Sequence, residues 1–174
     1  MDRGNTASTA NTNDVVKNST AVERRSDREL VVTRTFNAPA RAVFDAWTRP
    51  ELLKLWWAPR SRGVTLFSCE ADVRVGGRYR YAFGRDPEKP MVFSGVYKEV
   101  VAPERVVCTQ VFEPMPAGEA IITATFHEHQ GKTELVLHQL FPSKEALDGA
   151  VSSHMEEGMR ETFEQLEELV GSLR

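Results

Sequence analysis

The stretch TRTFNAPARAVFDAWTRPELLKLWW, residues 33–57, contains the end of a predicted strand, two predicted helices and all three tryptophans of the chain. The strand covers residues 29–36, where ELVVTRTF is dense in β-branched side chains. Asn37 is a suitable N-cap for the first helix. Thr48 and Glu51 have the spacing of a capping box, which predicts a second, short helix directly after the first. The fold therefore begins with a strand followed by two helices.

The tryptophans gather in this one segment, whereas a core normally spreads its large aromatic side chains over several elements. Consecutive side chains of a helix point about 100° apart, so Trp56 and Trp57 cannot share one narrow stripe. We place Trp56 in the interior and Trp57 at a flank or rim. Core packing, a cavity wall and partner docking all remain open for Trp56. For Trp57, rim or partner contact is as reasonable as packing.

The middle of the chain predicts an antiparallel sheet. RYRYAF, residues 78–83, alternates strictly, so its aromatic side chains share one face and its arginines share the other. Similar runs follow one another with only short turns between them, and this spacing favours antiparallel pairing of neighbours. The predicted strands of this region cover residues 65–73, 78–83, 91–101, 105–112, 120–128 and 132–141.

The C-terminal segment predicts one long amphipathic helix. After Pro142, Ser143 is placed to cap a helix that runs to about Leu173. Apolar residues recur there at helical spacing, which gives a rod roughly 45 Å long at about 1.5 Å per residue. The glutamates of the same segment are predicted to form a solvated face. The fold class is α+β: a curved antiparallel sheet wrapped around a long C-terminal helix, with two short helices after the first strand.

The first part of the chain differs in composition from the rest. Asn, Ser, Thr and charged side chains dominate residues 1–28, and so few apolar anchors cannot offset the entropy of ordering the chain. We expect a flexible polar tail there, with an arm that orders against a partner subunit as the alternative. Residues 29–174 have the length of a single domain.

The overall composition excludes several classes of protein. A formal net charge of -3 and a pI of about 5.9 argue against a broad nucleic-acid-binding surface. No apolar run approaches the ~20 residues of a membrane span, and the polar N-terminus lacks the apolar segment of a secretory signal. We therefore expect a cytoplasmic protein that neither spans a membrane nor binds nucleic acid.

Few residues have the spacing of a metal or catalytic site. Cys69 and Cys108 lack metal-ligand spacing, and free buried thiols are favoured over a disulfide. His127 and His129 could face one metal ion, but such a site normally needs three or four convergent ligands. We expect no metal and no cofactor. G-x-S-x-G, P-loop, G-x-G-x-x-G and H-E-x-x-H motifs are absent, which leaves only catalysis by scattered groups open.

The order of elements and four strings resemble the START-like superfamily, also called SRPBCC, with its helix-grip fold. The branch that the chain resembles is related to the C-terminal domain of the activator of heat-shock protein 90 ATPase. The resemblance implies a cavity between the curved sheet and the long helix, partly roofed by the two short helices. Relatives often carry Trp where this chain has Met159. The strings are TRTFNAPARAVFDAWTRPELLKLWW, CEADVRVGGRYRY, FSGVYKEVVAPERVVCTQVF and TELVLHQLFPSKEALDGAVSSHMEEGM, within residues 29–173.

The resemblance leaves the function open, because one fold can host many activities. The leading hypothesis is the binding of a small, largely hydrophobic ligand in the cavity. One alternative is a co-chaperone-like module, active in the stress response, that stimulates a heat-shock protein 90 type ATPase. Another is a cyclase or hydrolase that acts in the same cavity. Both a monomer and a homodimer remain open.

The candidate ligand contacts are apolar side chains with a few polar groups that could orient a ligand. For the polar groups, an internal hydrogen bond is the alternative role. His154 could also be structural or act as a general acid or base. Gly158, one helical turn later, indicates close backbone packing or room for a ligand. The candidates are Trp56, Tyr79, Tyr81, Phe93, Cys108, Gln110, Gln139, His154, Met155 and Met159.

Overall fold

The computed structural model describes residues 18–116 and 118–173. Within these ranges, one antiparallel sheet has the strand order β1-β2-β8-β7-β6-β5-β4-β3. The strands are β1 (Ala21–Arg24), β2 (Glu29–Phe36), β3 (Thr65–Ala71), β4 (Arg78–Gly84), β5 (Met91–Val101), β6 (Arg105–Phe112), β7 (Ala120–His129) and β8 (Lys132–Leu140). The helices are α1 (Ala40–Thr48), α2 (Pro50–Trp56), the 3-10 helix η1 (Arg60–Arg62), α3 (Lys144–Ser152) and α4 (Met155–Ser172).

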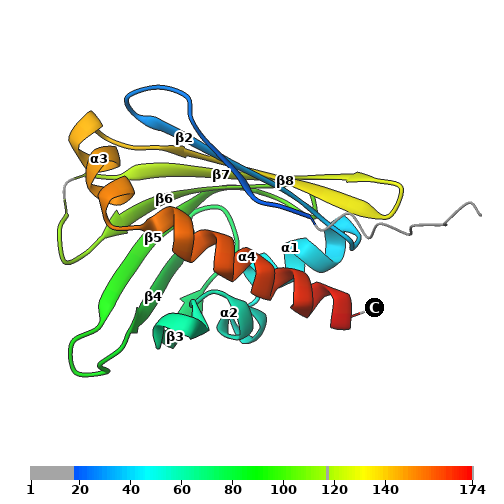
Figure 1. Ribbon diagram of the computed structural model, residues 1–174, viewed down its shortest axis with the longest axis horizontal. Helices are drawn as coiled ribbons and strands as arrows, with labels where there is room; N and C mark the ends of the chain where they lie inside the picture. The colour runs from blue at the N-terminus through cyan, green and yellow to red at the C-terminus, as the bar shows by residue number, and fades with distance from the viewer. Residues whose placement is uncertain (1–17, 117, 174) are drawn as a thin grey trace, which may run out of the picture.

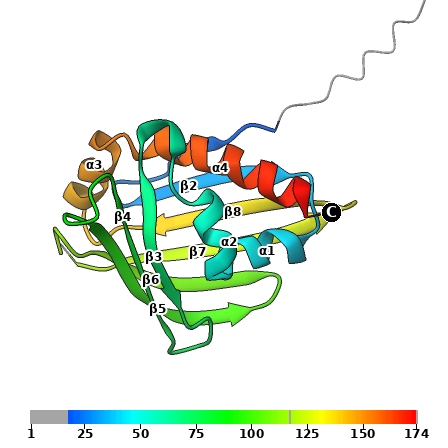
Figure 2. The same cartoon turned by 90° about the horizontal axis from the view of Figure 1, so that it is seen from below.

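The sheet is bent around the helices. Figure 1 shows β2, β8 and β7 above α4, whereas β4 and β3 lie below it. In the view of Figure 2, α4, α2 and α1 lie side by side over the strands. The α+β class, the two short helices after the strand over residues 29–36 and the C-terminal helix on the sheet are all confirmed. No described helix combines the length and the apolar character that crossing a membrane requires.

The C-terminal segment is broken into two helices, so the prediction of one continuous rod is wrong. Ser143 caps α3 as expected, because its hydroxyl accepts a hydrogen bond from the amide of Ala146 at 3.1 Å. The helix then ends at Ser152, and His154 has a left-handed backbone with φ of 62°. A right-handed helix cannot continue through that conformation. Figure 1 shows the resulting change of direction between α3 and α4.

The two predicted caps of the short helices are also wrong. No side chain of the preceding loop caps α1, which begins after Pro39 rather than after Asn37. Instead, the amide of Ala40 donates to the carboxylate of Glu128 in β7 at 2.7 Å. Thr48 is the last residue of α1, and its hydroxyl bonds back to a carbonyl one turn earlier. A carboxylate from a distant strand therefore stabilises a helix terminus that the local sequence leaves uncapped.

β1 lies inside the segment that the composition assigns to a tail. It pairs with β2 in antiparallel register, from Ala21 opposite Thr33 onward. Just before it, the buried Thr20 accepts hydrogen bonds from Arg160 and Arg34. The boundary predicted at residue 28 is therefore wrong for this strand, because sheet pairing supplies partners that composition does not reveal. Residues 1–17 of the predicted tail lie outside the described residues.

The glutamates of α4 do more than solvate the helix. Their partners come from η1, the loop before α1, the segment before β1, and β2. This face therefore holds α4 in place, which corrects the prediction of a merely solvated stripe. The contacts are Glu157 with Arg62 at 3.0 Å, Glu161 with the Ser61 amide at 3.3 Å, Glu164 with the buried Arg34 at 3.2 Å, and Glu167 with the Asn37 amide at 3.3 Å and the Asn18 side chain at 3.2 Å.

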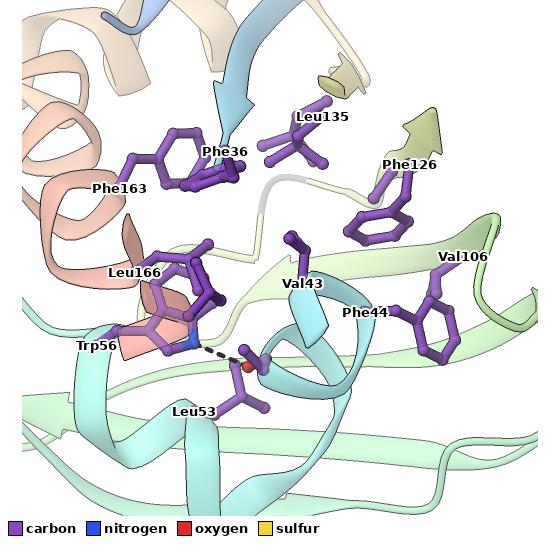
Figure 3. Packing of buried hydrophobic residues seen from close by; sticks show 14 of the residues in the cluster. Phe36, Val43, Phe44, Leu53, Trp56, Val106, Phe126, Leu135, Phe163 and Leu166 are labelled. Atoms are coloured by element: carbon purple, nitrogen blue, oxygen red, sulfur yellow. Dashed lines mark hydrogen bonds between the residues drawn. The ribbon is translucent and has the colours of Figure 1, made fainter. Parts of the chain in front are cut away.

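The core lies between the inner face of the sheet and helices α1, α2 and α4 (Figure 3). Phe163 of α4 is central to it, since its ring centroid lies 6.1 Å from that of Phe36 and 6.3 Å from that of Trp56. Both Phe163 and Trp56 are buried. One apolar side chain of α4 thus contacts the sheet and α2 at once.

The contact between β1 and α3 gives a pH prediction. Asp148 of α3 binds Lys144 at 3.0 Å and Arg24 at 2.7 Å, and these bonds hold the pKa of its carboxyl below the ordinary value. A depressed pKa stabilises the fold above the unfolded value of about 3.9, and this contribution is lost as pH falls through the folded pKa. We expect Asp148→Asn to lower the urea midpoint at neutral pH and the difference from the parent chain to close below about pH 4.

The control for this prediction is Glu168→Gln, which removes an exposed carboxylate of α4. It should leave the urea midpoint unchanged both at neutral pH and in acid. If the Asp148→Asn difference persisted undiminished in acid, the ionic origin of the contribution would be refuted.

Candidate functional site

A cavity of about 80 Å³ lies between the inner face of the sheet and the short helices α1 and α2. The three tryptophans and the three tyrosines of the chain all line it. The clustering of tryptophans in residues 47–57 thus has a structural counterpart: this segment forms one wall, and the tyrosines of β4 and β5 form the other. The lining residues are Trp47, Thr48, Leu53, Trp56, Trp57, Tyr79, Tyr81, Tyr97, Val106, Cys108, Gln110 and Ile122.

The wall from α2 is held by hydrogen bonds from neighbouring helices. The indole N–H of Trp56 donates to the carbonyl of Ala46 in α1 at 2.8 Å, the dashed line of Figure 3. From α4, the amide of Gln165 donates to the carbonyls of Trp56 and Ala58, both at 2.8 Å. The Trp57 ring faces β4 and lies edge-on at 5.5 Å from the ring of Tyr81.

The wall from the sheet contains an interruption between β5 and β6. The paired residues pass from Ser94 opposite Val111 to Tyr97 opposite Cys108, so Gly95 and Val96 have no partners in the ladder on that side. The hydroxyl of Tyr79 donates to the backbone carbonyl of Thr109 there. The amide of Val96 donates to the hydroxyl of Thr109 at 2.9 Å. Tyr79 thus reaches into the seam between two strands.

Gly95 makes this arrangement possible. A Cβ atom at this position would lie 1.9 Å from the carbonyl oxygen of Thr109 and 2.7 Å from the ring and hydroxyl of Tyr79. No real Cβ contact is that short, so only glycine allows the tyrosine to cross β5 and reach Thr109.

The ionisable groups of the cavity are held in their neutral forms. Burial raises the pKa of the Cys108 thiol to about 11 and raises the pKa values of Tyr79, Tyr81 and Tyr97 above the ordinary tyrosine range. Among the described residues that line the cavity there is no carboxylate, imidazole, ammonium or guanidinium group. The described residues of the lining therefore offer neither a nucleophile poised at neutral pH nor a base to activate one.

Five of the sequence-predicted site residues meet at this cavity, namely Trp56, Tyr79, Tyr81, Cys108 and Gln110. Phe93 packs against Trp57 at 6.1 Å instead, and Gln139 is buried in β8 away from the lining. Met159 packs against the core without reaching the cavity, and neither Met155 nor His154 lines it. The His154 side chain is 70% exposed at the break between α3 and α4.

The expected position of the cavity is corrected as well. No residue of α4 lines it, because Phe163 and Leu166 fill the space between α4 and the sheet. The hollow is displaced toward α1 and α2. Sequence reasoning missed Trp47 and Tyr97 as site residues. Tyr97 could have been recognised from the sequence, because it lies two residues after Gly95 on β5 and the two positions therefore share one face of the strand.

The thiols allow a direct test of this environment. Cys69 and Cys108 are both free, and burial raises the pKa of each to about 11. At about pH 8 the folded chain should react with iodoacetamide roughly a hundredfold more slowly than the unfolded chain, because the thiolate is the nucleophile. In Cys69→Ser, only Cys108 remains, so mass spectrometry of its alkylation reports on the cavity alone. Folded and unfolded rates of similar size would contradict the neutral environment.

The fold and the cavity together define a START-like protein of the SRPBCC superfamily. The family model described as "Activator of Hsp90 ATPase homolog 1-like protein" matches residues 37–171, and the chain belongs to this family. Among the described residues, no group of three or more potential metal ligands is present.

Solved structures agree with this fold. A crystal structure from Rhodobacter sphaeroides is 23% identical, with a TM-score of 0.81, and the match covers 88% of this chain and 99% of that one. A crystal structure from Nitrosomonas europaea is 25% identical, with a TM-score of 0.74, and the match covers 86% and 97%. A solution structure from Staphylococcus epidermidis is 30% identical, with a TM-score of 0.69, and the match covers 88% and 95%. Among curated proteins, no sequence match was found.

Proposed function

We propose that this chain is a cytoplasmic binding protein for a small, neutral, largely apolar molecule held in the aromatic cavity. The observation that carries the proposal is that every tryptophan and tyrosine of the chain lines one hollow whose ionisable groups are all kept neutral. Aromatic walls with a few polar groups are typical of ligand sites. Both cysteines are free thiols, in keeping with a reducing compartment.

The volume of the cavity limits the size of the ligand. Cavities for drug-sized ligands usually enclose about 300–1,000 Å³, and an engineered cavity of about 150 Å³ holds benzene. A cavity of about 80 Å³ is therefore suited to a molecule of about three to five non-hydrogen atoms. A larger hydrophobic ligand would require Trp57 or α2 to move outward.

One polar side chain of the lining can orient such a molecule. The donors of three other groups are already used, because the Trp56 indole, the Thr48 hydroxyl and the Tyr79 hydroxyl each donate to a backbone carbonyl. Among the described residues, the Gln110 side chain has no hydrogen-bond partner, although it lines the cavity. Its amide can both donate and accept, which fits a ligand with one small polar edge.

A cation is the competing ligand, because aromatic faces attract positive charge. That attraction amounts to about 0.5–2 kcal/mol. Removing an unpaired charge from water costs several kcal/mol, and no carboxylate lines the cavity to offset it. The neutral form of a ligand is therefore expected to bind in preference to its cationic form.

Imidazole and pyrazole test this proposal, because both are planar rings of about the right size. Imidazole titrates near the value of the histidine side chain, about 6.5, whereas pyrazole stays neutral between about pH 5 and 8. Monitored by tryptophan fluorescence, imidazole should bind about tenfold more weakly per pH unit below its pKa. The affinity for pyrazole should stay constant. Tighter binding of imidazole in acid would show a cation site, and failure of both rings to bind would refute the proposed function.

Two variants localise the binding. Cys108→Leu adds volume inside the cavity and should abolish binding of both rings. Cys69→Ser changes the other thiol, which does not line the cavity, and should leave the affinity unchanged. Equal effects of the two variants would place the ring elsewhere.

Membership of the Activator of Hsp90 ATPase homolog 1-like family supports a second candidate, a co-chaperone role in the stress response. Its test is the rate of ATP turnover by a heat-shock protein 90 type ATPase with and without the purified chain. An increase would support this role, whereas an unchanged rate at saturating protein would remove it.

A further inference from the structure

Two neighbouring tryptophans of the aromatic cavity are held in different ways. Trp56 is 3% exposed, and its indole N–H donates to the carbonyl of Ala46 at 2.8 Å. Trp57 is half-buried and packs against the core. Within the described residues, its indole N–H has no hydrogen-bond partner. Packing alone therefore holds the Trp57 side chain in the cavity wall.

The backbone on both sides of Trp57 is fixed. The buried side chain of Gln165 in α4 donates to the carbonyls of Trp56 and Ala58, both at 2.8 Å. The same side chain accepts a hydrogen bond from the amide of Arg60 at 3.1 Å. A shift of α2 would break these three bonds, whereas rotation of the Trp57 side chain about its own bonds breaks none of them. The Trp57 ring is therefore the movable part of this wall.

The Trp57 ring occupies a slot between three other rings. Its centroid lies 5.5 Å from that of Tyr81 and 4.9 Å from that of Phe83 on β4. On β5, the centroid of Phe93 lies 6.1 Å away. All three contacts are edge-on, with interplanar angles of 70° to 78°, which is a favoured arrangement of aromatic pairs. This aromatic slot, formed by Tyr81, Phe83 and Phe93, therefore fits a flat ring system.

The aromatic slot adjoins the aromatic cavity, and the Trp57 ring lies between them. Tyr81 and Trp57 line the cavity, whereas Phe83 and Phe93 do not. Rotation of Trp57 away from the sheet would open Phe83 and Phe93 to the cavity and join the two spaces. The cavity of about 80 Å³ would then gain the room of an indole, which is a fused two-ring system.

We propose that Trp57 is a rotating gate and that the open site binds a neutral, flat molecule of two or three fused aromatic rings. The inference rests on the proposed function, because it enlarges the same cavity and names the class of ligand. Such a molecule replaces the indole in the slot and makes the same edge-on contacts there. Opening exposes the indole of Trp57, so the apparent affinity is reduced by the fraction of molecules in which the gate is open.

The probe for the gate is 2-naphthol, a two-ring compound whose hydroxyl, like that of tyrosine, stays protonated at neutral pH. In nuclear magnetic resonance spectra of the full chain, the Trp57 indole N–H signal should move toward its position in free tryptophan as 2-naphthol binds. The Trp56 signal should keep its hydrogen-bonded position. Nuclear Overhauser effects should connect protons of 2-naphthol to the rings of Phe83 and Phe93. Binding without these changes would overturn the gate.

Pyrazole separates failure of the gate from failure of the proposed function. Its single small ring does not need the aromatic slot. A parent chain that binds pyrazole but not millimolar 2-naphthol would lack the gate and retain the proposed function. A chain that binds neither compound would refute both.

Replacement of Trp57 by alanine should act on the two compounds in opposite directions. Trp57→Ala leaves the slot open, so 2-naphthol should bind roughly tenfold more tightly, because no closed form competes. Pyrazole should bind more weakly, since it loses one wall of the cavity. The matched control is Leu55→Ala, which changes a 49% exposed side chain of the same helix outside the cavity and should leave both affinities unchanged. A change of the same sign for both compounds in Trp57→Ala would contradict the gate.

Discussion

Replacing Trp56 with alanine is expected to lower the free energy of unfolding by about 3–5 kcal/mol, the range typical of buried tryptophans. The side chain is 3% exposed, packs at 5.3 Å from the ring of Trp47, and donates its indole N–H to Ala46. Its removal would enlarge the aromatic cavity and separate α1 from α2. Urea unfolding followed by circular dichroism measures the loss independently of tryptophan emission.

Leu55→Ala provides the matched control, because Leu55 lies on the same helix and is 49% exposed. Its cost should stay below about 1 kcal/mol. Added indole should restore part of the stability of Trp56→Ala, since a ligand that binds only the folded state stabilises it. A loss below about 1 kcal/mol for Trp56→Ala would show that the helices α1 and α2 collapse into the space, contrary to the packing described.

Gly95→Ala is expected to cost about 3 kcal/mol, because one methyl group must displace backbone as well as a ring. The new Cβ would meet the carbonyl oxygen of Thr109 at 1.9 Å and Tyr79 at 2.7 Å. Relief requires both moving β6 away and expelling the tyrosine hydroxyl from the seam, because neither movement alone removes both contacts. Expulsion would leave a buried hydroxyl without its acceptor, which itself costs about 1–3 kcal/mol. The urea midpoint measures the combined loss.

The same substitution at Gly158 should have the opposite sign. Gly158 lies inside α4, and a Cβ there meets no atom within 4 Å. The sequence-based expectation of close backbone packing at this glycine is therefore wrong, and Gly158 does not line the aromatic cavity. Gly158→Ala should stabilise the chain by about 0.5–1 kcal/mol through helix propensity. Similar effects of the two substitutions would contradict the steric role of Gly95.

Much of the fold could be predicted from local patterns. The alternation of RYRYAF correctly placed Tyr79 and Tyr81 on the inner face and Arg78 and Arg80 on the outer face, because successive strand side chains point to opposite sides. Successive side chains of a helix point about 100° apart, and this offset likewise separated Trp56, which is buried, from Trp57, which is half-buried. Such patterns show which face of an element is apolar.

The candidate site was predicted less completely, because a face pattern does not say where space remains. Five candidates meet at the cavity, but Met155, Met159 and His154 were chosen on the assumption that α4 borders it. The packing of Phe163 against Phe36 fills that position instead. The acidic stripe of α4 was misjudged for a related reason: the partner of Glu164 is Arg34, 130 residues away in sequence.

The sequence by itself determined strands β2 to β8, the buried faces, the two short helices and the gathering of tryptophans, since each depends on neighbours within a few residues. Only the tertiary structure decided the break at His154, the pairing of β1 and the position of the cavity. These depend on contacts such as that of Gln165 with Trp56, which join residues 109 positions apart. A periodic pattern shows which side of one element faces water and which side faces the core. The volume left between elements is set by how all of them pack together.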